Sequence, residues 1–419
     1  MQRPIKIICG YLATFFLACT SCSFLWGGDW PQGLGPNRNG VAQQEKPLQA
    51  WPDSGPVTAW SHTLGSGFAG PIVVGAKVIV FHRIDDSERV EALDAKTGKV
   101  IWRQDFKAYY QGGFNPDSGP RATPVVAGNL VFVFGAASDL HCLDLATGKP
   151  KWSRTLGQDY QAPDGYFGAG SGLLVMADHV LVNVGGIKVG IVALDIQSGK
   201  TVWEATAEKA SYSSPTVLSI GGTNYALFIT RMQAIALNPV TGKLLFSTPF
   251  GKQGPTVNGA TPVAIDNHVF LTASYRIGAR MLELVQDGKN FKTQWSGDDI
   301  FSSQYATPLP HNGHLFGTHG REDIGVAALR CIDMASGKVQ WEKTNFGVAH
   351  AILVKDKFLA LNTAGELVLV KANSSQYEEV ARAKVSAATT RCFPALSNGY
   401  FYFRNNQGNQ GKLTALKLP

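Results

Sequence analysis

Apolar runs that end in Asp or Asn recur along this chain. Each is followed by a turn of the form x-x-(Thr/Ser)-Gly-Lys and by a bulky ring four residues after the glycine. Short apolar runs bounded by turn residues predict β-strands. The five copies are Asp94–Trp102, Asp144–Trp152, Asp195–Trp203, Asn238–Phe246 and Asp333–Trp341.

The spacing of these copies predicts the architecture. Strand repeats of about 46 residues are typical of a β-propeller with one four-stranded antiparallel blade per repeat. A small residue followed by Pro, as in Thr123-Pro124, marks the start of several inner strands, because Pro is tolerated at the first residue of a strand. Counting inner strands and counting third strands both give eight blades. The predicted fold class is therefore an all-β, eight-bladed propeller.

The chain ends before the eighth blade has an outer strand. An outer-strand sequence lies near the other end, in residues 57–64, where Trp60 corresponds to Trp102. We expect this segment to pair with the C-terminal blade and close the ring, which removes exposed sheet edges.

The residues of the repeat have structural explanations. The glycine needs a positive φ, the Asp or Asn accepts backbone N–H bonds, and the ring fills the space between blades. The positions expected to act in this way are Asp94, Gly98, Trp102, Asp144, Gly148, Trp152, Asp195, Gly199, Trp203, Asn238, Gly242, Asp333, Gly337, Trp341 and Trp60. The acidic positions are spread around a ring and cannot converge, so no metal site is expected from them.

The first residues predict export. Arg3 and Lys6 precede a short apolar stretch and small residues, which is the pattern of a secretory signal peptide. We divide the chain into a signal at 1–23, a leader segment at 24–56 and the propeller at 57–419. Phe16-Leu17-Ala18-Cys19 approximates a lipoprotein cleavage site with a poor first residue, so Cys19 is a lipidation candidate and simple secretion is the alternative.

Composition excludes few functions. The net charge of +7 falls to +5 without the signal, and no aromatic-basic run suits nucleic acid. Neither His-x-x-x-His nor Cys-x-x-Cys spacing occurs, and there is no nucleophile elbow. No catalytic residue and no metal ligand are assigned. Cys142 and Cys331, which each lie two residues before a repeat Asp, are expected to be small buried core residues.

Propeller topology locates a candidate binding site. The loops between blades lie opposite the Thr-Gly-Lys turns, and the residue three before each inner-strand Pro should ring the channel mouth there. Together with neighbours and second-strand ends, the candidates are Arg121, Tyr212, Tyr305, Arg391, His350, Arg276 and His319. Arginine forks and Tyr rings suit an anionic ligand or an acidic partner segment. The alternative is that these arginines pair with loop acids such as Asp117, Asp164 and Glu322, or line a water-filled channel.

The repeats resemble the PQQ-like (quinoprotein-like) propeller family, whose pattern is A-L-D-x-x-T-G-x-x-x-W. Ala92–Trp102 and Ala193–Trp203 match it closely, and residues 29–40 are similar to a leader that often precedes such propellers. One branch of the family is the PQQ- and calcium-dependent alcohol and glucose dehydrogenases. The other is BamB, the non-catalytic outer-membrane assembly lipoprotein. The chain lacks the adjacent Cys pair of the alcohol-oxidising group, and its plan is closer to the BamB-like branch.

This resemblance implies an exported, non-catalytic scaffold in the periplasm or on the outer membrane, which binds a protein partner or an anionic ligand. No cofactor is expected under that interpretation. One alternative is a quinoprotein oxidoreductase with PQQ and calcium. Another is a sensor of small molecules or carbohydrates.

Overall fold

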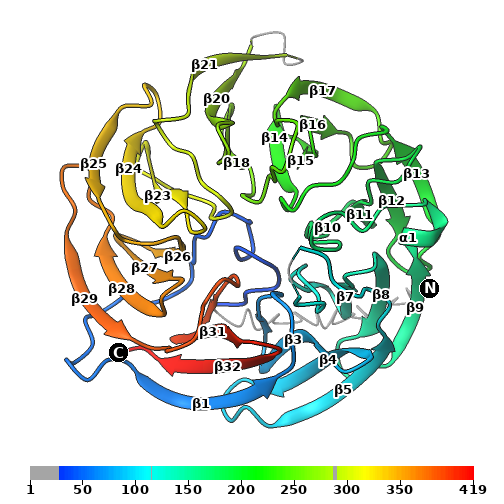
Figure 1. Ribbon diagram of the computed structural model, residues 1–419, viewed down its shortest axis with the longest axis horizontal. Helices are drawn as coiled ribbons and strands as arrows, with labels where there is room; N and C mark the ends of the chain where they lie inside the picture. The colour runs from blue at the N-terminus through cyan, green and yellow to red at the C-terminus, as the bar shows by residue number, and fades with distance from the viewer. Residues whose placement is uncertain (1–27, 115, 286–289) are drawn as a thin grey trace, which may run out of the picture.

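Eight four-stranded sheets form a closed ring in the computed structural model, which describes residues 28–114, 116–285 and 290–419 (Figure 1). Neighbouring strands within each sheet are antiparallel. The predicted all-β, eight-bladed propeller is confirmed. Within the described residues the one helix is the short α1 (Leu156–Asp159), and no helix there is long and apolar enough to cross a membrane.

The first four blades follow one another along the chain. Blade 1 comprises β2 (Ile72–Val74), β3 (Lys77–Ile84), β4 (Ser87–Asp94) and β5 (Val100–Lys107). Blade 2 comprises β6 (Val125–Ala127), β7 (Leu130–Phe134), β8 (Asp139–Asp144) and β9 (Pro150–Thr155). Blade 3 comprises β10 (Leu174–Met176), β11 (His179–Asn183), β12 (Ile191–Asp195) and β13 (Thr201–Ala205). Blade 4 comprises β14 (Thr216–Ile220), β15 (Thr223–Ile229), β16 (Gln233–Leu237) and β17 (Leu244–Pro249).

The remaining blades complete the circle. Blade 5 comprises β18 (Val263–Ile265), β19 (His268–Ala273), β20 (Gly278–Leu284) and β21 (Phe291–Gly297). Blade 6 comprises β22 (Leu309–His311), β23 (His314–Arg321), β24 (Val326–Asp333) and β25 (Val339–Lys343). Blade 7 comprises β26 (Ala349–Val354), β27 (Lys357–Asn362), β28 (Glu366–Lys371) and β29 (Glu379–Lys384). Blade 8 comprises β30 (Ala395–Ser397), β31 (Tyr400–Gln407) and β32 (Gln410–Lys417), with β1 (Val57–Leu64) as its outer strand.

The ring is closed by the N-terminal strand, as the sequence predicts. β1 pairs antiparallel with β32, from Val57 opposite Lys417 to Leu64 opposite Gly411. The two ends of the propeller are therefore hydrogen-bonded within one blade, and no outer strand is missing.

The repeat turn is built by side-chain hydrogen bonds. In blade 1 the Asp94 carboxylate accepts from the Thr97 backbone N–H at 2.8 Å and from the Thr97 hydroxyl at 2.7 Å. Gly98 has a φ of +69°, which a residue with a Cβ adopts only at a cost. The turns at Asp144, Asp195 and Asp333 repeat these carboxylate bonds.

Each repeat tryptophan ties its blade to the next one. The Trp102 indole N–H donates to the Leu145 carbonyl at 3.1 Å, and Trp60 on the closing strand donates in the same way to Ala95 at 3.0 Å. A Cβ added at Gly98 would lie 2.6 Å from the Trp60 ring. Glycine is therefore required at this position for two reasons, namely its positive φ and the close approach of the neighbouring blade's indole ring.

The leader segment crosses the central channel, where it is drawn in blue in Figure 1. Trp30 pairs with Val73 on β2, the Pro31 carbonyl accepts from Val126 on β6, and Gly40 and Ala42 bond to Leu353 on β26. The buried Arg38 guanidinium donates to the Pro215 and Leu173 carbonyls of blades 4 and 3. Whether the channel is open could not be predicted from the sequence; the structure fills it with this segment.

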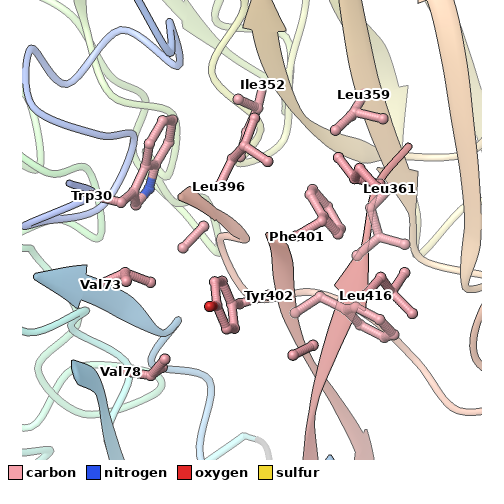
Figure 2. Packing of buried hydrophobic residues seen from close by; sticks show 14 of the residues in the cluster. Trp30, Val73, Val78, Ile352, Leu359, Leu361, Leu396, Phe401, Tyr402 and Leu416 are labelled. Atoms are coloured by element: carbon pink, nitrogen blue, oxygen red, sulfur yellow. The ribbon is translucent and has the colours of Figure 1, made fainter. Parts of the chain in front are cut away.

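A large apolar cluster joins the leader to the two ends of the ring. Trp30, Val73, Ile352, Leu396 and Phe401 belong to it, and Figure 2 shows side chains from the leader and from blades 1, 7 and 8 converging there. Elsewhere, Cys142 and Cys331 are buried, as expected, and both are free; Cys392 is free and buried as well. The predicted signal and its candidate Cys19 lie outside the described residues.

Candidate functional site: the central cavity on the loop face

The two faces of the ring differ. The turn face carries the Thr-Gly-Lys turns and the turns between first and second strands, and the loop face carries the connections between blades. A cavity of about 250 Å³ lies at the channel mouth on the loop face. We call it the central cavity. Its aromatic lining consists of Phe68, Phe167, Tyr212, Tyr275, Tyr305 and Phe393.

The leader lies next to this cavity. A Cβ added at Gly33 would be 3.4 Å from the Phe393 ring and 3.6 Å from Thr123, and both of these residues line the cavity. Because the leader occupies the channel there, the cavity is a cup on one face of the ring.

Arg121 lines the cavity, but its guanidinium is already hydrogen-bonded to nearby backbone groups. Its guanidinium donates to the backbone carbonyls of Gly119 and Asp117 and lies over the rings of Phe68 and Tyr110, with its carbon 5.7 and 5.6 Å from their centres. The Asp117 carboxylate is 4.0 Å away. Burial lowers the pKa of Arg121. This arginine therefore fixes the 117–121 segment beneath an aromatic face.

Arg391 lines the cavity opposite an acid. Its Nε donates to Glu322 Oε2 at 2.8 Å, and the Tyr305 hydroxyl donates to the same oxygen at 2.7 Å. Burial lowers the pKa of Arg391, but the hydrogen bond to Glu322 and the nearby charges outweigh it, so the net pKa is raised. Pairing with loop acids, the alternative weighed from the sequence, is thus present at Arg391 with Glu322 and at Arg121 with Asp117.

His350 is a buried, neutral member of the cavity wall. Burial lowers its pKa to about 4. Its Nε2 contacts the Arg391 carbonyl at 2.9 Å and must carry the proton, because a carbonyl only accepts. Within the described chain its Nδ1 has no hydrogen-bond partner. The ring holds the Arg391 backbone in place.

Two sequence candidates lie elsewhere. Arg276 is exposed on the β19–β20 connection and is not among the residues that line the central cavity. His319 is half-buried and its Nδ1 accepts from the Ser302 backbone N–H at 2.9 Å, so it supports a loop. Their second strands end on the loop face, but farther from the channel axis than the inner-strand starts.

Several cavity residues were missed from the sequence as site candidates. They are Phe167, Tyr275 and Phe393. Phe393 directly precedes an inner-strand Pro, a signal that could have identified it. Phe167 comes from a long loop whose path no local pattern predicts.

An aromatic run leads from the cavity to the outer surface of the loop face. Phe114, which is 76% exposed, packs edge-on against Tyr166 at 5.4 Å between ring centres. Phe167 lies 6.3 Å from Tyr166 and 5.5 Å from Tyr212, which lines the cavity. We call Phe114, Tyr166, Phe167 and Tyr212 the aromatic run.

The cavity does not suit a calcium-bound quinone. Calcium takes several carboxylate and carbonyl oxygens, yet the described residues that line the cavity include no Asp or Glu. Across the described ranges, no group of three His, Cys, Asp or Glu side chains could hold a metal ion. The nearby Glu322 is already engaged by Arg391 and Tyr305.

A ring of eight closely similar blades with a cup at one mouth defines a PQQ-like propeller. A sequence-family model described as outer membrane protein assembly factor BamB matches residues 86–343. This chain therefore belongs to the BamB family.

Individual relatives agree with this assignment. The outer membrane protein assembly factor BamB of Burkholderia pseudomallei (strain K96243) is 26% identical over 285 residues, which cover 66% of this chain and 69% of the relative. The crystal structure of BamB from Moraxella catarrhalis superposes with a TM-score of 0.61 at 15% identity, covering 86% of this chain and 99% of that one.

The fold is also shared with an enzyme. The quinohemoprotein alcohol dehydrogenase from Comamonas testosteroni superposes with a TM-score of 0.65 at 14% identity, covering 93% of this chain and 80% of that one. At this level of identity the likeness concerns the fold, and the chemistry has to be judged from the site.

Proposed function

We propose that this protein is a non-catalytic scaffold of the cell envelope, which binds a protein partner in outer-membrane protein assembly through its loop face. Membership of the BamB family supports a role in outer-membrane protein assembly. The aromatic run is the observation that carries the choice of face.

Large exposed apolar side chains support binding on that face. Besides Phe114, the loop face presents Tyr109 at 52%, Ile187 at 67% and Ile324 at 59% exposure. Apolar groups gathered on loops of a rigid scaffold are typical of interaction sites. Aromatic anchors next to a preformed cup could bury a partner's side chain without reorganising the backbone.

A finer version of the proposal gives Arg391 a direct role. Its side chain is 38% exposed, whereas that of Arg121 is 9% exposed. An acidic segment or anionic ligand could therefore exchange with Glu322 at Arg391. It could not displace the backbone carbonyls that hold Arg121 without unfolding the 117–121 segment.

Capture of envelope proteins tests the loop-face proposal. Full-length protein is compared with Phe114→Asp on the loop face and with Val240→Asp, which changes a 56% exposed apolar residue on the turn face. The expected result is that Phe114→Asp loses an outer-membrane assembly partner and Val240→Asp retains it. Equal capture by both variants would remove the proposal.

Two further measurements test its finer parts. Arg391→Ala should weaken capture if an acidic segment binds there, and unchanged capture would confine binding to the apolar surface. Mass spectrometry of the mature protein tests export and acylation, because a lipidated N-terminus would begin at Cys19. A mature chain that retains residues 1–23 would contradict the envelope assignment.

A further inference from the structure

A second cavity lies beside the central one. It has a volume of about 290 Å³ and shares Gly170, Tyr212 and Val257 with the central cavity. We call it the side cavity. It lies on the loop face between blades 3 and 4, under the 163–170 loop. The Tyr212 hydroxyl accepts from the Phe167 backbone N–H at 2.8 Å and so holds that loop in place.

The side cavity is lined by a buried amide that has no partner. Asn183, the last residue of β11, is 2% exposed. Neither its Nδ2 nor its Oδ1 has a hydrogen-bond partner within the described chain. Asn258 lines the same cavity; its Nδ2 donates to the Thr230 carbonyl at 2.9 Å, while its Oδ1 has no partner among the described residues.

The other blades show that the fold does not need a polar group at this position. Strand register places Asn183 four residues after the partner of the repeat Asp. The same position is occupied in the other blades by Phe81, Phe134, Ile229, Thr272, Thr318, Leu361 and Arg404.

Four of these seven equivalents are buried apolar residues, and the three polar ones have partners. The Thr272 hydroxyl donates to the Phe301 carbonyl at 2.8 Å. The Thr318 hydroxyl accepts from Ala349 N at 3.5 Å, and the Arg404 guanidinium donates to the Gly65 carbonyl at 2.7 Å. Asn183 is the exception, because its amide is buried without compensation. A buried polar group that has no protein partner and faces a cavity calls for a bound group, either water or a ligand, to satisfy it.

We propose that the side cavity binds a small molecule through a primary carboxamide. A primary carboxamide presents its oxygen and one N–H on the same side, so it can pair with the Asn183 amide through two hydrogen bonds. Its second N–H is available for Asn258 Oδ1. The donors and acceptors it supplies match those that the two asparagines leave unpaired.

The charged residues of the side cavity indicate which groups the ligand should carry at the end away from its carboxamide. Lys209, Arg231 and Asp164 line it. A molecule with a carboxylate and an ammonium group opposite its carboxamide fits this arrangement, and L-glutamine is the simplest probe. The volume of the cavity suits one small molecule.

Ligand-detected NMR with purified full-length protein tests the proposal. L-glutamine should bind, and L-glutamate should bind at least tenfold more weakly, because its carboxylate cannot donate to the two Oδ1 atoms. Asn183→Leu places the residue type of blade 7 at the site. The variant should have a melting temperature equal to or above that of the wild type and should lose glutamine binding.

Every other pattern of results overturns the proposal. Equal binding of glutamate excludes carboxamide recognition. Binding of N-acetylglucosamine in place of glutamine would show that the Asn183 amide recognises sugar hydroxyl groups and not a primary carboxamide. No binding of either probe in the millimolar range would mean that water alone occupies the cavity. If Asn183→Leu does not fold, Lys209→Gln, at an exposed position, should weaken glutamine binding several-fold. Partner capture by Asn183→Leu separates this inference from the scaffold proposal, which predicts that capture is unchanged.

Discussion

Two buried glutamates on β4 should respond to neutralisation in opposite directions. Glu88 is 3% exposed and Glu91 is 2% exposed. Glu88 Oε1 accepts from the Ala136 backbone N–H at 2.9 Å, whereas Glu91 Oε2 accepts from His62 and His82 at 3.0 and 3.1 Å. Burial raises the pKa of Glu88 to about 7. Burial also acts to raise the pKa of Glu91, but the two histidines outweigh it and lower that pKa to about 2.

These pKa values set the sign of the prediction. Folded Glu88 keeps a proton that the unfolded chain releases above its ordinary pKa of 4.5. The wild type therefore loses stability as the pH rises from about 4.5 to 7, by about 3 kcal/mol in full. Glu91 acts oppositely, because the stability it contributes is present above pH 4.5 and is lost as the pH falls toward 2.

Urea unfolding followed by tryptophan fluorescence measures both effects. Glu88→Gln should be more stable than the wild type by about 3 kcal/mol at pH 8, and by less than about 1 kcal/mol at pH 5. Glu91→Gln should be less stable than the wild type by about 2–3 kcal/mol at pH 8. A Glu88→Gln difference that is the same at both pH values, or a loss of stability at pH 8, would refute this reasoning.

Three further predictions concern the packing of blades and the cavity wall. Gly98→Ala should lower the free energy of unfolding by about 2–4 kcal/mol, because the methyl group adds overlap with Trp60 to the cost of a positive φ. Gly75→Ala, at a φ of +56° with nothing within 4 Å of the added Cβ, should show only the conformational cost of about 1 kcal/mol in the same urea titration. Trp203→Phe should cost about 1–2 kcal/mol through loss of the 3.0 Å indole bond to the Pro239 carbonyl, and a change in melting temperature no larger than that of a surface substitution would contradict it. His350 has a pKa lowered by burial to about 4, so its contribution to stability should decline as the pH falls from 6.5 toward 4; ring proton shifts in NMR that titrate near 6.5 would be inconsistent with this burial.

The sequence predicted the local chemistry of the blades well. The Asp94–Thr97 turn and the positive φ of Gly98 depend on residues a few positions apart, so both could be predicted from the repeat pattern alone. The closing role of residues 57–64 also followed from the sequence, because Trp60 repeats the outer-strand signature. The eight-blade count rested on the same periodicity.

The candidate site was predicted in part. Arg121, Tyr212, Tyr305, His350 and Arg391 do line the central cavity, since inner-strand starts must ring the channel. Arg276 and His319 do not, because second-strand ends lie farther out and their loops take individual paths. Pairing of the mouth arginines with loop acids, Glu322 among them, was weighed from the sequence. Which acid meets which arginine could not be predicted, because Glu322 is 69 residues from Arg391 in the chain.

The amino-acid sequence alone thus determined the blade, its turn and the number of repeats, because these depend on contacts within or between adjacent repeats. Only the tertiary structure decided that the leader fills the channel, that Glu322 meets Arg391, and that Asn183 is buried without a partner beside Asn258. Each of these depends on where separate loops and strands meet around the ring. The physical reason is that periodicity fixes the scaffold, whereas side-chain pairing across the channel and between blades depends on distances that no periodic pattern encodes.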